Sequence, residues 1–146
     1  MKKSDLILAS VKGVVPSPNG MIVFLWTDEK AFVIYVDLSI GSAISLHLNN
    51  AEKERPLTHD LINHILTGFN ISVEKVIIND VSNNIFFASL ILKMSNELGV
   101  KLLEIDCRPS DAILIALQSN RPIFVHRKVL DAVEDMTEII EHLLKG

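Results

Sequence analysis

Hydrophobic residues in the first quarter of the chain recur at the spacing of β-strands. Residues 5–15 mix apolar and small polar positions, and a turn signal rich in Pro, Asn and Gly at 16–20 precedes the apolar run at 21–26. A polar segment at 27–30 then leads into a second apolar run, Ala31–Val36. This pattern predicts a hairpin that continues into a meander of three strands.

The spacing changes to that of helices in the next segment and then returns to that of strands. Apolar residues at 40–48 and 57–66 follow helical spacing. Residues 71–78, 85–94 and 100–106 each fit a strand, and the first two are joined by a short polar turn. We therefore expect two helices between two meanders.

The remaining residues predict a helix at 110–119, a short strand at 122–125, and helical segments over 127–145. This order of elements is typical of an α+β fold, with a mixed, largely antiparallel sheet and helices packed against it. Nothing along the chain has the composition of a linker, so residues 1–146 are expected to form a single domain.

An apolar seam crosses the C-terminal helical region, with steps of 4, 3, 4 and 3 residues. Its members are Val129, Val133, Met136, Ile140 and Leu143. A seam of this kind packs either onto the chain's own sheet or onto a second copy. Asp135 followed by Glu138 would alternatively start a new helix and divide the seam.

The composition adds an expectation about assembly and location. Hydrophobic residues make up 49% of the chain but aromatic residues only 5%, so the surplus is aliphatic and a neighbouring copy would cover it. We expect a homo-oligomer. No apolar run approaches the ~20 residues of a membrane helix, and no signal-like segment opens the chain. The expected location is the cytoplasm, without a membrane partner.

Charge and cysteine content narrow the classes of chemistry. The net charge of -4 argues against tight electrostatic capture of nucleic acid, although a metal ion can supply local positive charge in an acidic nuclease. The single cysteine, Cys107, excludes an internal disulfide. We interpret it as a small buried side chain rather than a nucleophile.

The densest polar cluster lies where a predicted strand gives way to a helix, at Asp106, Arg108, Ser110 and Asp111. Ser110 sits where a helix N-cap is expected, and Asp111 falls in the first turn, where its charge complements the helix dipole. Alternate side chains of a strand share a face, so Asp106 and Arg108 would point the same way. The residues leave two interpretations open: a metal and phosphate site, or an Arg108–Asp106 ion pair beside a capped helix.

A second polar cluster opens the helix predicted at 57–66 and consists of Thr58, His59 and Asp60. Thr58 would cap the helix, with Asp60 in its first turn, and this arrangement needs no function. His59 is the candidate of most interest, because an imidazole can act as a general base or as a metal ligand near neutral pH.

Both clusters resemble signatures of the bifunctional nuclease domain family, small bacterial proteins and plant relatives to which DNase and RNase activity have been attributed. Residues 106–113 read Asp-Cys-Arg-Pro-Ser-Asp-Ala-Ile, against the family's Asp-Ala-Arg-Pro-Ser-Asp-Ala-Ile, and 122–125 read Pro-Ile-Phe-Val. Residues 55–61 reproduce a second signature, Arg-Pro-Leu-Thr-His-Asp-Leu. The chain departs from the family at 37–43, where a Gly-Pro-Ala-Glu-Ala-like segment is usual.

The resemblance implies a nuclease that hydrolyses phosphodiester bonds of DNA or RNA with the help of a divalent metal, Mg²⁺ or Mn²⁺. Asp106 and Asp111 would hold the metal, and Arg108 with Ser110 would bind the phosphate.

The catalytic residues on this interpretation are Arg108, which would stabilise charge on the phosphate, and His59 with Asp60, which would orient or deprotonate water. The two motifs must then meet in space. The alternative is a nonenzymatic oligomeric module, regulatory or for interaction, in which both motifs are capped helix starts.

Overall fold

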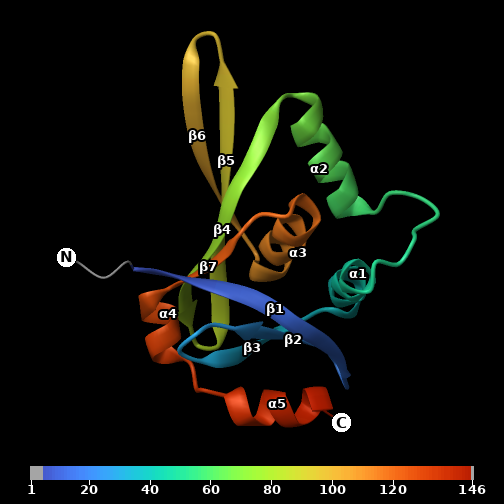
Figure 1. Cartoon of the computed structure of the whole chain (residues 1–146), viewed down its shortest axis with the longest axis vertical. Helices are drawn as coiled ribbons and strands as arrows, with labels where there is room; N and C mark the ends of the chain where they lie inside the picture. The colour runs from blue at the N-terminus through green and yellow to red at the C-terminus, as the bar shows by residue number, and fades with distance from the viewer. Residues whose placement is uncertain (1–4, 146) are drawn as a thin grey trace.

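A seven-stranded sheet forms the centre of the molecule, in the order β3-β2-β1-β7-β4-β5-β6 (Figure 1). The computed structural model describes residues 5–145. The strands are β1 (Leu6–Ser17), β2 (Gly20–Trp26), β3 (Ala31–Val36), β4 (Ile71–Ser82), β5 (Ile85–Asn96), β6 (Gly99–Cys107) and β7 (Ile123–His126). All pairings among these strands are antiparallel except that between β4 and β7. The predicted α+β class is confirmed.

The sheet consists of the two predicted meanders, joined by the short strand β7. β7 pairs antiparallel with β1 and parallel with β4, so it fills the space between the two meanders. The turn between β4 and β5 contains Asn83 and Asn84 with φ of 51° and 64°. Two successive residues with positive φ give the turn that matches the twist of a two-residue hairpin.

Three helices lie together on one side of the sheet: α1 (Leu38–Leu48), α2 (Thr58–Gly68) and α3 (Pro109–Ser119) (Figure 1). α3 packs between α1 and α2 and against β4 and β5. Its residues 112–116 are all buried, as their apolar run predicts. α1 approaches β2 closely at Gly41, where an added Cβ would lie 2.6 Å from Met21 Cβ.

The C-terminal region forms two helices, α4 (Arg127–Ala132) and α5 (Thr137–Lys145), rather than one. Asp135 Oδ1 accepts a hydrogen bond from Thr137 N at 3.0 Å, which starts α5 afresh. The prediction of a continuous seam is therefore wrong, and the alternative of a new helix start is correct. Val129 and Ile140 are fully buried in the chain's own core. None of the helices within 5–145 is long and apolar enough to span a membrane.

Packing of α5 onto the chain's own core predicts unequal effects of shortening two of its apolar residues, Ile140 and Leu143. Ile140 is 0% exposed and Leu143 is 51% exposed. Ile140→Ala should lower the free energy of unfolding by about 2–5 kcal/mol, because it leaves a cavity. Leu143→Ala should change it by only about 0.5 kcal/mol. Urea unfolding of the three proteins measures the difference, and equal losses would show that α5 is not anchored through Ile140.

Candidate functional site

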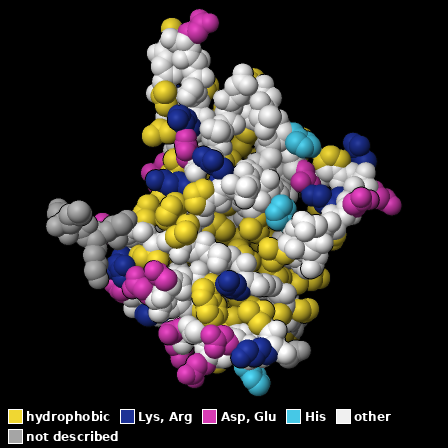
Figure 2. Space-filling model, in the orientation of Figure 1, with side chains coloured by type: hydrophobic (Ala, Val, Ile, Leu, Met, Phe, Trp, Pro, Cys, Tyr) yellow, Lys and Arg dark blue, Asp and Glu magenta, His cyan; other side chains and the backbone are white. Residues whose placement is uncertain are grey.

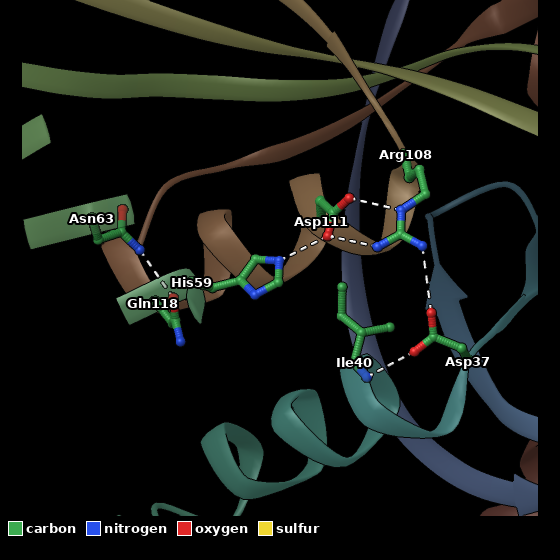
Figure 3. Close-up of polar contacts among 7 residues, drawn as sticks. All are labelled: Asp37, Ile40, His59, Asn63, Arg108, Asp111 and Gln118. Atoms are coloured by element: carbon green, nitrogen blue, oxygen red, sulfur yellow. Dashed lines mark hydrogen bonds and ion pairs between the residues drawn. The ribbon is translucent and has the colours of Figure 1, made fainter. Parts of the chain in front are cut away.

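The N-termini of three helices meet at one polar cluster, made of Asp37, His59, Arg108 and Asp111 (Figure 3). Asp37 is the N-cap of α1, and its Oδ1 accepts a hydrogen bond from Ile40 N at 3.0 Å. His59 lies in the first turn of α2. Arg108 is the N-cap of α3, and Asp111 lies in that helix's first turn. Helix N-termini carry partial positive charge, so this arrangement favours an anion near the cluster.

Arg108 joins α3 to α1 through two carboxylates. Its Nε lies 2.8 Å from Asp111 Oδ2, and its Nη2 lies 3.2 Å from Asp111 Oδ1. Its Nη1 makes a longer contact, 3.4 Å, with Asp37 Oδ2. The Arg108 side chain is nevertheless 64% exposed. The guanidinium is held in place on one side and remains open to solvent on the other.

His59 contacts the same carboxylate from the opposite side. His59 Nε2 lies 2.8 Å from Asp111 Oδ1, and the two side chains are 14% and 26% exposed. The two motifs therefore meet in space, as the family resemblance required. No residue within 5–145 makes a hydrogen bond to the other ring nitrogen of His59, Nδ1.

The protonation states follow from these contacts. Partial burial would raise the pKa of Asp111, but hydrogen bonds from Arg108 and His59 outweigh that effect and hold the pKa below its ordinary value. Asp111 is therefore charged at neutral pH, and its Oδ1 accepts the proton that His59 carries on Nε2. When His59 is neutral, Nδ1 keeps its lone pair and can accept a proton.

The cap predicted at Thr58 is wrong, because α2 begins one residue earlier than that assignment requires. The N-cap is Leu57, and its N–H donates to Asp60 Oδ2 at 2.8 Å. Asp60 also pairs with Lys53 at 2.6 Å and accepts from Gln118 Nε2 at 3.0 Å. Asp60 thus fixes the start of α2 and ties it to α3.

The cap predicted at Ser110 is also wrong. Arg108 takes the N-cap position and Pro109 the first helical position, where the missing N–H of proline costs nothing. Ser110 follows in the first turn and is only 7% exposed. Its backbone belongs to the helix N-terminus that faces the cluster.

Within residues 5–145, Asp106 forms no hydrogen bond or ion pair with the cluster. It lies near the end of β6 opposite Ser89 and is exposed. Arg108 pairs with Asp111 and Asp37 instead, so the suggested Arg108–Asp106 ion pair is not formed. The chain turns into α3 at Arg108, and the alternation of a strand no longer applies there.

The donor set does not fit a metal ion as it is arranged. Within residues 5–145, no group of three or more His, Cys, Asp or Glu side chains could hold one. Both oxygens of Asp111 already accept hydrogen bonds from Arg108. A divalent ion at Asp111 would have to compete with the guanidinium.

Asp37 is the member of the cluster that sequence reasoning missed. A signal was present, because an Asp between an apolar strand and a helical repeat is a typical N-cap. Its contact with Arg108 spans 71 residues of sequence, however, and no local pattern encodes such a pair. Asp37 also opens the segment where the chain departs from the resembled family.

Comparison with known proteins gives matches to one family and to individual relatives. The model of the bifunctional nuclease domain matches residues 22–138, most of the chain and every residue of the cluster. The chain belongs to the bifunctional nuclease domain family. It is also 35% identical over 119 residues to uncharacterised proteins of Mycobacterium tuberculosis, strains CDC 1551 / Oshkosh and H37Rv. Each match covers 80% of this chain and 68% of the relative.

Cys107, which stands where the family signature has Ala, has an unreactive setting. Burial, with the nearby charges of Asp111 and Asp106, raises the pKa of Cys107 to about 11. Its Sγ faces Ala88 O at 3.8 Å. A thiol with this pKa is almost fully protonated at neutral pH, so its setting agrees with the interpretation of Cys107 as a packing residue.

The charge on Asp111 predicts a pH-dependent contribution to stability. A carboxyl group with a lowered folded pKa contributes stability above its unfolded pKa of about 3.9, and the contribution is lost as pH falls through the folded pKa. Asp111→Asn should therefore lower the free energy of unfolding by about 1 kcal/mol at pH 7. Urea unfolding between pH 7 and pH 2 should show the difference shrinking toward zero, whereas a constant difference would contradict this origin.

Proposed function

We propose that this protein hydrolyses phosphodiester bonds of DNA or RNA, with His59 as the general base. The observation that supports the proposal most is the 2.8 Å contact between His59 Nε2 and Asp111 Oδ1. It leaves Nδ1 free to accept a proton and fixes the orientation of the ring. Membership of the bifunctional nuclease domain family supplies the class of reaction.

The proposed reaction uses the chain's own residues. His59 Nδ1 takes a proton from water while the water oxygen forms a bond to phosphorus and the bond to the leaving oxygen breaks. Asp111 stabilises the positive charge that develops on the imidazole. Solvent protonates the leaving oxygen, and His59 returns its proton to solvent.

Arg108 is placed to stabilise the charge that builds up on the phosphate. Its exposed guanidinium lies among three helix N-termini, and its weakest contact is the 3.4 Å one to Asp37. A phosphate oxygen would replace Asp37 at Nη1 while Asp111 continues to hold Nε and Nη2. The N-terminal turn of α3, including the backbone of Ser110, would face the same phosphate.

Substrate affinity is expected to be weak. The net charge is -4, and Figure 2 shows Lys and Arg scattered among Asp and Glu on the face drawn, with no broad basic patch there. Nucleic-acid affinity rises with the number of phosphates that Lys and Arg neutralise. A single exposed arginine at the cluster, Arg108, therefore predicts that the protein turns over a weakly bound substrate rather than binding it tightly.

The alternative function, a nonenzymatic oligomeric module, has one observation in its favour. Leu98, Val100 and Leu102 lie exposed at the tip of the β5–β6 hairpin and along β6, an edge strand of the sheet. An exposed apolar edge is a site for pairing with another chain. Light scattering tests the predicted homo-oligomer, and an oligomer without any nuclease activity would favour the alternative.

Single substitutions test the catalytic roles. His59→Ala and Asp111→Asn should each lower the rate of cleavage of labelled single-stranded DNA and RNA by about 10²–10⁴-fold. Arg108→Lys should lower it by about tenfold or more, because an ammonium cannot keep two contacts to Asp111 and reach a phosphate. His64→Ala, on the same helix but outside the cluster, is the matched control. Full activity of the His59 variant would exclude the proposed base.

Metal dependence stays a prediction, and Asp106 with it. The same assay with EDTA, Mg²⁺ and Mn²⁺ measures it. If Asp106 binds the ion, Asp106→Asn should raise the metal concentration for half-maximal cleavage by about tenfold or more, since the amide loses the charge that a hard cation needs. An unchanged metal titration would show that Asp106 does not bind the ion. Full activity in EDTA would show that the residues around His59 catalyse the reaction without a metal ion.

A further inference from the structure

A groove of about 920 Å³ runs beside the outer edge of β3. Residues 32–37 form one wall, and the turn and first residues of β5, including Ile85 and Phe86, lie opposite. Phe32 and Phe86 stack at 6.0 Å between ring centroids, which joins the two walls. β3 and the β4–β5 turn lie at the same end of the molecule in Figure 1.

The β3 wall presents backbone groups without partners. β3 pairs only with β2 and is an edge of the sheet. In an antiparallel pair, alternate residues direct both N–H and C=O away from the neighbouring strand. Ala31 is one of these, because its N–H donates to Asp135 Oδ1 and its C=O accepts from Met136 N. Val33 and Tyr35 follow at the same alternation and therefore face the groove.

The connection between α4 and α5 hydrogen-bonds to the first residue of β3, at the edge where a neighbouring strand would pair. Its contacts with Ala31 occupy the first position along the β3 edge, at 3.3 Å and 2.7 Å. The connection then turns into α5, and nothing within residues 5–145 continues along Val33 and Tyr35. The edge is covered at one end and open over the rest.

The opposite wall has an open edge as well. Among residues 5–145, β6 pairs with β5 only from Ala88 onward, so no described strand lies on the outer side of Ile85 and Phe86. Ser82 and Ile85 pair across the two-residue turn, which directs the N–H and C=O of Phe86 outward. Two unpaired strand edges thus line one groove.

We propose that this groove binds an extended peptide segment of a partner protein, which adds a strand along β3 beside Val33 and Tyr35. A strand rises ~3.3 Å per residue, so the open edge accommodates about three or four residues. Main-chain hydrogen bonds hold the peptide, and the apolar walls take alternate side chains.

The charges at the groove favour a peptide that also carries Lys or Arg. The charged side chains that line it are Asp37, Glu134 and Arg108, and Arg108 is paired with Asp37, which leaves the carboxylate of Glu134 to attract a cation of the peptide. Tyr35, 72% exposed at the groove, offers a further surface for the peptide's side chains.

The test begins with a phage-displayed library of random seven-residue peptides, selected on the full chain. Enriched peptides are synthesised with a fluorescent label, and their binding is measured by fluorescence polarisation. Val33→Pro should weaken binding at least about tenfold, because it removes the N–H that would donate to the peptide. The fold should tolerate this change, because that N–H makes no hydrogen bond within the sheet and edge strands accept proline at such positions. Val33→Thr keeps the N–H and is the matched control. Thermal unfolding checks that each variant is folded.

A second arm does not depend on the folding of any variant. The enriched peptide is made with N-methyl groups on alternate residues, which block main-chain pairing but keep every side chain. Weaker binding by about tenfold or more supports the added strand. Equal binding of the methylated peptide, or no enriched peptide at all, would overturn it.

Two other occupants would appear as distinct results. A ten-nucleotide single strand whose own binding Val33→Pro weakens by about tenfold or more would assign the groove to nucleic acid. An oligomer that Val33→Pro converts to monomers would assign it to a second copy of this chain. Either result overturns the assignment to a partner peptide. The binding measurements need no catalysis, so they stand or fall independently of the proposed nuclease activity.

Discussion

The carboxylate of Asp111 is the contact on which the polar cluster depends. It lies between the guanidinium of Arg108 and the imidazole of His59, and it holds the first turn of α2 against the first turn of α3. Without its charge, Arg108 and His59 would repel each other whenever the imidazole is protonated. The relative positions of Arg108 and His59 therefore depend on one acidic residue in the first turn of a buried helix.

That helix explains why the cluster is both rigid and accessible. Residues 112–116 of α3 are packed in the core, so the helix cannot shift, while its N-terminus emerges where α1 and α2 also begin. The apolar part of the sequence fixes the positions of the helices, and of the ionisable groups at their N-termini Arg108 and Asp37 face solvent while His59 and Asp111 are mostly covered. Gly41 contributes by letting α1 approach β2, which sets the place of Asp37 at the start of α1.

Local patterns predicted the strands and the helices, because periodicity and turn residues act over short stretches of chain. The meeting of the two motifs was instead an expectation from the family resemblance. Local patterns misplaced both caps, since a hydroxyl residue in a helix's first turn looks the same in sequence as one at its N-cap. They missed Asp37, whose contact with Arg108 needs the tertiary fold. They also took Asp106 and Arg108 to share a face, which holds only while a strand stays regular. The prediction of a continuous C-terminal seam was wrong for a similar reason. The apolar residues keep a regular spacing across Asp135, but the chain starts a new helix there.

The position of β7 has a consequence for synthesis of the chain. This four-residue strand, Ile123–His126, joins the two meanders, yet it comes late in the sequence. Until it leaves the ribosome, β1 and β4 each keep an unpaired inner edge, and the two halves of the sheet have no ladder between them. Contacts between residues so far apart along the chain slow folding, because loop closure must precede them. The nascent protein therefore exposes two unpaired strand edges until β7 is made, and edges of this kind can pair with other chains.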